Sequence, residues 1–556
     1  MSRPPLEQGF GRAAEFAACR VGWFGCDSSV RVAFLLLVWF SFTLAGCGRR
    51  LDRAELVFIN GAEPELLDPA LVTAQATSRV TYALFEGLVI FDPDAKVRPG
   101  VAERWEVSPD GTEYTFHLRP NACWSNGEPV TAEDFVYAWR RALLPETGSE
   151  YASQLYPIVN AEAFNTGKIA DFGEVGVSAP SDHILKVKLA HPTPYFLDLC
   201  AFSTFLPVHR VTVETHSDWA SKPSKFMGNG PYLLEEWRLF DRVRLVKNPR
   251  YWNADGIFLK SIDVLPAARP ITAFNLYATG AADLMLDKGL APTPLLNELR
   301  KRPDFHSAPF LATYFVRFNV SRPPFSDSRV RRAVSLVVDR KELVEKITRG
   351  GEPTAESFVP PGTGSGYVPP AGSRRDPQAA RRLLAEAGFP GGAGFPVVRY
   401  LYKGDSDLDR DIAVEIQGAL QRELGIRMLL QPQEWTVYLA LQGALDYDLC
   451  RSSWVADYND PNTFLNMFVT GDGNNRTGWS NASYDALIAA AAAEPDTARR
   501  FECFRKAESI LVVDEAAVCP LYFYVGIQFY DATRLGGLSQ NLLDEHPLRF
   551  LHWKSP

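Results

Sequence analysis

An acidic residue, Asp457, stands where an apolar, strand-like segment ends, and its neighbours suggest a charge-binding role. It follows the run 447–453 and is flanked by Trp454 and Tyr458. A carboxylate that loses its water among aromatic side chains is costly unless a cation meets it, and the ammonium group of a ligand is one such cation. The alternative is structural, because an Asp here can cap the turn formed by Asn459-Asp460-Pro461. From these residues alone, the frequency of Asp in turns favours the structural alternative.

The sequence carries no assembled catalytic or metal-binding motif. Its eight His residues are scattered, and none forms the H-E-x-x-H spacing of a zinc site. A G-x-S-x-G nucleophile elbow and a phosphate-binding P-loop are also missing. Acid pairs such as Glu235-Glu236, and Asp405 with Asp407, are common on solvated surfaces and are weak support for a glycosidase. We therefore predict a binding protein and not an enzyme, with no cofactor and no metal.

Composition bounds the class of protein and its partners. The chain of 556 residues is long enough for two or three domains. Aromatic residues are plentiful, with 12 Trp, 20 Tyr and 35 Phe, which suits both a core and a ligand cleft. The net charge of −8 argues against a nucleic-acid partner, which needs a clustered basic surface.

The N-terminal region is predicted to be a targeting segment. Residues 32–44 form a nearly unbroken apolar run after Arg31, too short to span a bilayer comfortably but typical of a signal peptide. The run ends in Leu44-Ala-Gly-Cys47, which resembles the lipobox of bacterial lipoproteins and implies cleavage after residue 46 and lipidation of Cys47; an ordinary cleavage site with an incidental Cys is the alternative. The segment 1–30 is unusually long and mixed in charge, so we expect the true start near Val30.

Five cysteines remain after residue 47, and their spacing favours neither a zinc site nor a disulfide framework. They are Cys123, Cys200, Cys450, Cys503 and Cys519. We expect buried free thiols, although one bridge is open in an oxidising compartment.

Beyond residue 54 strands and helices are interleaved, which predicts an α/β fold. Residues 56–60 read as a first strand, and Trp105-Glu-Val with 113–118 reads as a hairpin around Pro109-Asp110-Gly111. Helices are expected over 132–141, where Thr131 and Asp134 form a capping box, over 378–387 and over 486–493. The segment 353–375, rich in Pro and Gly, is expected to be a surface loop.

The chain resembles the extracytoplasmic oligopeptide-binding proteins of peptide ABC transporters, which belong to the family 5 solute-binding proteins. The resemblance extends from about residue 54 to the C-terminus. The segments that carry it are Leu67-Asp-Pro69, Leu84-Phe-Glu-Gly-Leu88, Pro99-Gly-Val-Ala-Glu-Arg-Trp105, 110–119, 124–135, Asn229-Gly-Pro-Tyr232, Asn248-Pro-Arg-Tyr-Trp252, 325–333 and 383–389.

This resemblance implies a two-lobed periplasmic-binding-protein-like (type II) fold with an additional small subdomain. Lobe I is then built from 47–86, 204–308 and 525–556, the small subdomain from 87–203 and lobe II from 309–524. Closure of the lobes would bury the ligand between them.

The resemblance also assigns charged site residues. Asp457 matches the acid that pairs with the α-ammonium of a peptide. Arg451 matches the arginine that can meet the C-terminal carboxylate of a short peptide; an ion pair within lobe II is its alternative.

Six further positions match residues of the family's peptide pocket. Tyr151 lines the cleft from the small subdomain, Trp454 and Tyr524 are aromatic pocket positions, and Asn474 is a polar one. For Trp454 and Tyr524 core packing is the alternative, and for Asn474 a plain turn. The main chain near Ser453 to Val455 is expected to pair with the peptide as an added strand.

In one respect the chain departs from the enteric members of the family, which carry a disulfide next to the acid. The matching positions here are Ala312 and Val455, so the crosslink is missing.

The function implied is that of a lipid-anchored receptor on the periplasmic or cell-envelope side. It would capture short peptides, deliver them to an ABC permease and ATPase complex, and act as a monomer. The alternatives are the same scaffold binding a murein peptide or another solute, a lipoprotein hydrolase, and a sensor or chaperone.

Overall fold

The computed structural model describes residues 53–555, which form one compact unit from Ala54 onward. The predicted signal peptide 1–46 and Cys47 lie outside the described residues. Within 53–555, no helix combines the length and the apolar character that a membrane span requires.

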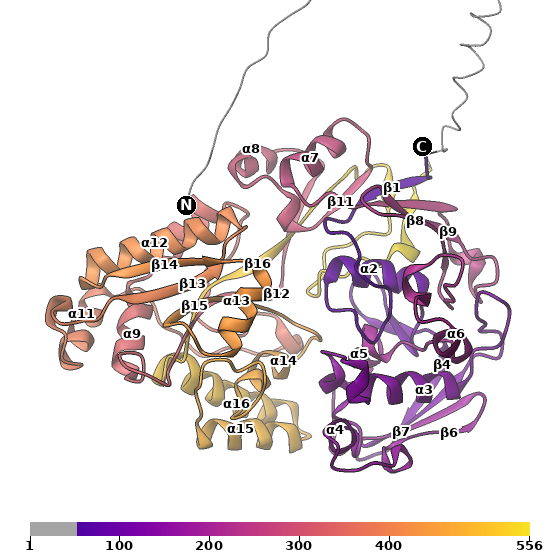
Figure 1. Cartoon of the computed structure of the whole chain (residues 1–556), viewed down its shortest axis with the longest axis horizontal. Helices are drawn as coiled ribbons and strands as arrows, with labels where there is room; N and C mark the ends of the chain where they lie inside the picture. Colours follow the sequence, from indigo (N-terminus) through magenta and orange to yellow (C-terminus); the bar gives the residue numbers. More distant parts are fainter. Residues whose placement is uncertain (1–52, 556) are drawn as a thin grey trace, which may run out of the picture. The chain divides into compact units, whose positions relative to one another are not determined.

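A ten-stranded mixed sheet dominates the fold and brings together strands that are distant in sequence (Figure 1). Its order is β14 (Met428–Gln433), β13 (Val398–Lys403), β15 (Leu449–Val455), β12 (Phe305–Phe318), β16 (Val518–Tyr530), β11 (Leu284–Leu286), β1 (Leu56–Ile59), β10 (Ser261–Leu265), β9 (Arg242–Lys247) and β8 (Tyr232–Arg238). The α/β class predicted from the sequence is confirmed, as is the first strand.

Two long antiparallel strands, β12 and β16, connect the two halves of this sheet. At one end Phe305 pairs with Phe529, in the half that contains β1 and β11. At the other end Arg317 pairs with Val518, in the half that contains β13 and β15. The register of the pair shifts between Pro309 and Thr313, so the ladder is irregular where it passes from one half to the other.

Helices cover the half of the sheet around β13 because they bury apolar stripes against it. In α12 (Asp407–Leu424), Ile412, Ala413, Ile416 and Leu420 are buried in a core shared with Tyr314 and Val316 of β12. The opposite face of β12 contributes Phe315 to a separate core, which α15 (Ala482–Ala493) and α16 (Thr497–Ser509) complete.

A second sheet, of four antiparallel strands, belongs to the segment predicted as the small subdomain. Its order is β4 (Ala102–Val107), β5 (Glu113–Leu118), β7 (Ile184–Lys188) and β6 (Val177–Ser181). Trp105 pairs with Phe116, which confirms the predicted hairpin. Helix α3 (Ala132–Leu143) lies nearby and begins with the predicted capping box of Thr131 and Asp134.

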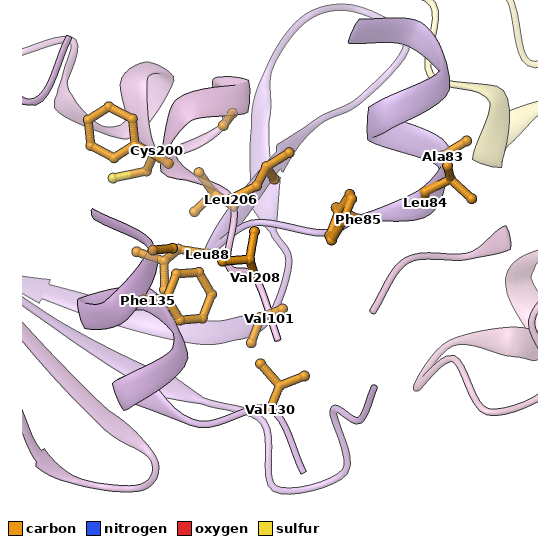
Figure 2. Close-up of a cluster of buried hydrophobic side chains, with 14 of the residues drawn as sticks. Ala83, Leu84, Phe85, Leu88, Val101, Val130, Phe135, Cys200, Leu206 and Val208 are labelled. Carbon is orange, nitrogen blue, oxygen red and sulfur yellow. The ribbon is translucent and has the colours of Figure 1, made fainter. Parts of the chain in front are cut away.

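One apolar core extends from this second sheet to the β1 half of the large sheet. Figure 2 shows part of it, with side chains from the segments 83–88, 130–135 and 200–208 gathered around Val101. Residues 87–203 therefore share their main apolar core with the β1 half. Contacts with the other half are smaller: Phe91 and Ala95 pack against the core that contains Phe315, and Tyr195 stacks on Tyr458.

Two local expectations need correction. Helix α15 begins at Ala482, four residues earlier than predicted, because Asn481 caps it by accepting a hydrogen bond from the Tyr484 N–H. The segment 353–375 is not wholly a surface loop, since Phe358 and Val359 are fully buried. The Glu508 carboxylate accepts hydrogen bonds from the N–H groups of both residues, which fixes the segment against α16.

Candidate functional site

The Asp457 carboxylate, just beyond the end of β15, is held by neutral groups from two distant parts of the chain. Its Oδ2 accepts a 2.9 Å hydrogen bond from Nε2 of Gln154, which is 303 residues away in sequence. Its main-chain N–H donates to Oγ1 of Thr463 at 3.2 Å. The turn that follows is capped by Asp460, which accepts a hydrogen bond from the Asn462 N–H.

Burial raises the pKa of Asp457 to about 7, although hydrogen bonds from Gln154 and Thr463 act in the opposite direction. No cation among residues 53–555 contributes to this pKa. The carboxylate is therefore desolvated and hydrogen-bonded while its charge is left without a counter-charge from the described protein.

Aromatic residues of the 87–203 segment face Asp457 and the turn that follows it. The Asp457 carboxylate, together with burial, raises the pKa of the Tyr151 hydroxyl, which places the two groups close together. The Tyr151 ring packs edge-on against Phe202 at 5.0 Å between centroids. Tyr195 stacks on Tyr458 at 4.1 Å.

Arg451 lies on β15 and is already paired within its own half of the molecule. Its Nε is 3.2 Å from Oδ1 of Asp409, a buried acid on α12. Its guanidinium lies 4.9 Å from the ring centroid of Tyr314, whose hydroxyl also donates to Asp409. Burial lowers the pKa of Arg451, but the charge of Asp409 together with the hydroxyls of Tyr524, Tyr314 and Tyr438 outweighs burial, and the pKa is raised. The alternative weighed for Arg451, an ion pair within the lobe, is present.

Ser453 and Tyr524 gather on the same sheet face as Arg451. Burial raises the pKa of Tyr524, and the nearby guanidinium of Arg451 and a hydrogen bond with Ser453 partly counter this effect. Nζ of Lys288 lies 4.6 Å from the Tyr524 ring centroid and 2.5 Å from Oε1 of Glu352. This face therefore carries two cations, each with its own acid.

Trp454 and Asn474 lie on the opposite face of β15. The Trp454 side chain packs against the core that contains Phe315, and its buried indole Nε1 has no hydrogen-bond partner among the described residues. Oγ of Ser452, also on this face, accepts a hydrogen bond from Arg317, which donates in turn to the main-chain carbonyl of Asn474. The Asn474 N–H donates a hydrogen bond to the Asp472 carboxylate. The main chain of Asn474 therefore belongs to a turn, which agrees with the alternative that Asn474 is a plain turn residue.

The β15 strand has one edge that is partly open. It pairs with β12 along its full length, but with β13 only at Leu449 and Cys450. The Ala456 N–H donates towards β12, so by alternation the main-chain groups of Val455 and Ser453 point to the other edge. The Arg451 carbonyl on that edge accepts a 2.5 Å hydrogen bond from the Tyr438 hydroxyl. The edge from Ser453 to Val455 thus has no partner strand among residues 53–555.

The two positions that match the family's disulfide face each other across β12 and β15. Ala312 is the register partner of Val455, and Val455 is 47% exposed while Ala312 is fully buried. Cross-strand neighbours have the separation that a disulfide requires. The five cysteines beyond residue 53 are free thiols, and Cys123 and Cys503 are only partly buried.

The predicted residues thus fall into three groups around β15. Asp457 and Tyr151 meet at the end of the strand. Arg451, Ser453 and Tyr524 lie on one face, and Val455 shares that face because side chains alternate along a strand. Trp454 and Asn474 lie on the other face. Sequence reasoning missed Gln154 and Asp409. Gln154 gives no sequence signal, whereas Asp409 does, since it shares a helical spacing with the buried Ile412, Ala413 and Ile416.

Within residues 53–555, no cluster of three or more His, Cys, Asp or Glu side chains has the arrangement that holds a metal ion. The arrangement around β15 instead suits a ligand that bears a positive charge and an extended main chain.

Comparison with known proteins agrees with this geometry. Residues 96–476 match the family model described as bacterial extracellular solute-binding proteins, family 5 Middle. The chain is 36% identical to the periplasmic oligopeptide-binding protein OppA of Salmonella typhimurium over 483 residues, which cover 85% of this chain and 88% of the relative.

Two solved structures are also similar. The murein tripeptide binding protein MppA of Escherichia coli aligns with a TM-score of 0.81 and 33% identity, over 91% of this chain and 99% of that one. The complex of Haemophilus influenzae OppA with RPPGFSPFR aligns with a TM-score of 0.80 and 32% identity, over 90% and 99% of the two chains.

These likenesses confirm the predicted fold class, two lobes with an additional subdomain. The matched family consists of extracytoplasmic binding proteins, so the prediction that the chain is not an enzyme is confirmed as well. The chain belongs to the bacterial extracellular solute-binding proteins of family 5.

Proposed function

We propose that this protein binds short peptides through their free amino end and delivers them to an ABC importer. The observation that carries the proposal is the Asp457 carboxylate, which is desolvated yet faces only neutral donors. A peptide α-ammonium supplies the missing positive charge and up to three N–H donors. A neutral sugar would leave that charge uncompensated, so the site favours a cationic or zwitterionic ligand.

The open edge of β15 supports recognition of the peptide main chain. A peptide that pairs with Ser453 and Val455 gains hydrogen bonds that do not depend on its side chains. Its side chains then alternate between the face of Tyr524 and the face of Trp454. This alternation accounts for pocket residues on both faces of one strand.

The direction of the peptide follows from the positions of the charged groups. With its amino end at Asp457, the peptide runs antiparallel to β15, and its carboxyl end extends towards Arg451. Arg451 and Val455 lie about 13 Å apart along the strand at about 3.3 Å per residue, the span of roughly four extended residues. Arg451 already pairs with Asp409, so the carboxyl end is held less strongly than the amino end.

The lobe assignment and the lipid anchor are part of the same proposal. The boundaries 308/309 and 524/525 fall inside β12 and β16, and the register shift between Pro309 and Thr313 supports a hinge at this crossing. Cys47 is proposed as the lipidated residue that anchors the receptor on the outer side of the cytoplasmic membrane or in the periplasm. A monomer would then present the peptide to a permease and ATPase complex.

Two measurements test this function. Mass spectrometry after mild denaturation should identify peptides that co-purify with the protein. Calorimetry on the refolded, ligand-free protein should then show binding of a free tetrapeptide and at least about 100-fold weaker binding of its N-acetylated form, the loss of one buried charge pair. Equal affinity for both forms would refute recognition of the amino end. A co-purified murein peptide would identify a cell-wall fragment as the ligand, and the proposed role as a peptide receptor would stand.

A further inference from the structure

Among the residues that the structure describes, Gln154 donates a hydrogen bond to the Asp457 carboxylate from the 87–203 segment, with 2.9 Å between Nε2 and Oδ2. It lies in the short helix η2 (Ala152–Leu155), directly after Tyr151. Asp457 belongs to the other half of the large sheet, beyond β15. The contact therefore bridges two parts of the molecule that share no strand.

The chemistry of this donor matters as much as its position. An amide N–H orients a carboxylate without neutralising it, whereas a Lys or Arg at the same place would form an ion pair. The other groups that act on Asp457 are also neutral: Thr463 donates a hydrogen bond, and Tyr151 lies beside the carboxylate. The carboxylate is thus fixed in place with its charge intact.

Further contacts from the 87–203 segment meet the chain directly after Asp457. The Tyr195 ring stacks on Tyr458, and the Tyr195 hydroxyl accepts a 2.9 Å hydrogen bond from Nδ2 of Asn462. Asp198 accepts a hydrogen bond from the main chain of Asn459. Residues 457–462 therefore form a continuous interface with the 87–203 segment, and Asp457 lies at one end of it.

We infer that Gln154 is a positioning residue for the ligand's amino end: it couples docking of the 87–203 segment to the presence of a ligand ammonium at Asp457. Without that ammonium, docking buries an uncompensated negative charge and is unfavourable. With it, the charge is paired, and the Gln154 hydrogen bond adds to the closed arrangement. The neutral side chain also reserves Asp457 for the ligand. This inference rests on the proposed function.

The decisive variant is Gln154→Lys, which places a cation where the amide donates. Its ammonium should pair with Asp457 in place of the ligand. We expect the affinity for a free tetrapeptide to fall at least about 100-fold, while the affinity for the N-acetylated peptide stays within about tenfold of wild type. The ratio between the two peptides, which is large for wild type, should therefore approach one.

A second readout is the shape of the unliganded protein. Gln154→Lys should be as compact in small-angle X-ray scattering as the peptide-bound wild type, because the new ion pair favours docking without ligand. Gln154→Ala keeps the charge of Asp457 and loses the donor. It should bind the free peptide about tenfold or more weakly, since hydrogen bonds to charged groups contribute more than neutral ones, and retain a large ratio between the two peptides.

Ser153→Lys is the matched control, because Ser153 is exposed in the same short helix and the substitution adds the same charge. It should leave both affinities unchanged. The inference is overturned if Gln154→Lys keeps the wild-type ratio, or if Ser153→Lys lowers the ratio equally. Failure of the proposed function itself would look different, because wild-type protein would then not distinguish the two peptides at all.

Discussion

Replacing Asp457 by Asn removes the charge on which the proposed recognition depends and keeps the size and one acceptor of the side chain. The Gln154 amide can still donate to the remaining side-chain oxygen at this position, so the local structure should persist. A ligand ammonium in the closed site then lacks its counter-charge. Truncating one partner of a buried, hydrogen-bonded charge pair costs about 2–5 kcal/mol, which is about 30- to 5000-fold in affinity.

The size of this effect depends on how fully Asp457 is ionised before the peptide binds. Since its pKa is about 7, roughly half of the sites carry a proton at pH 7. Releasing that proton on binding weakens the peptide binding free energy of wild type by only about 0.4 kcal/mol at this pH. The difference in binding free energy between wild type and Asp457→Asn should therefore stay within about 2–5 kcal/mol.

Isothermal titration calorimetry with a free tetrapeptide at pH 7.5 measures this loss directly. Asp182→Asn, a change of the same kind at an exposed position, is the matched control and should bind like wild type. Affinity of Asp457→Asn within threefold of wild type, with an unchanged melting temperature, would show that the ammonium is held elsewhere and would refute the reasoning.

Three further predictions concern charge and stability. Peptide affinity should fall up to tenfold per pH unit below about 7, because Asp457 must lose its proton to meet an ammonium, and a pH series in Asp457→Asn should lack this slope; equal slopes would contradict the assignment. Arg451→Met should destabilise the protein by about 3–5 kcal/mol in urea unfolding by leaving buried Asp409 unpaired, and Asp409→Asn in the same chain should restore most of that loss; no restoration would disprove the pairing. Burial raises the pKa of Glu508 to about 7, so its contribution to stability is fully present below its usual pKa of about 4.3 and is lost as the pH rises through 7. The melting temperature of wild type relative to Glu508→Gln should therefore decrease between pH 5.5 and 8, and a difference that does not vary with pH would count against this.

Local signals in the sequence predicted the start of an element well where neighbouring side chains fix that start. The capping box of Thr131 and Asp134 is present as expected, because both groups needed for it lie within one turn. The start of α15 was missed although Asn481 is a good cap, since a run of Ala residues with no apolar stripe hid where the helix begins.

The candidate site was predictable only in part, for a related reason. Asp457 stands out in the sequence because its neighbours are aromatic. Its hydrogen-bond donor Gln154 comes from 303 residues away, and no local pattern marks a neutral amide for that role. The pairing of Arg451 with Asp409 likewise depends on how α12 packs on β15, which is a tertiary contact.

The most direct test of the central claim is a crystal structure of the protein with a bound tetrapeptide. The account predicts that the α-ammonium nitrogen of the peptide lies about 2.7–2.9 Å from a carboxylate oxygen of Asp457, and that the peptide main chain pairs with Ser453 and Val455. A peptide amino group that faces solvent, with Asp457 bonded only to groups of the protein, would contradict it.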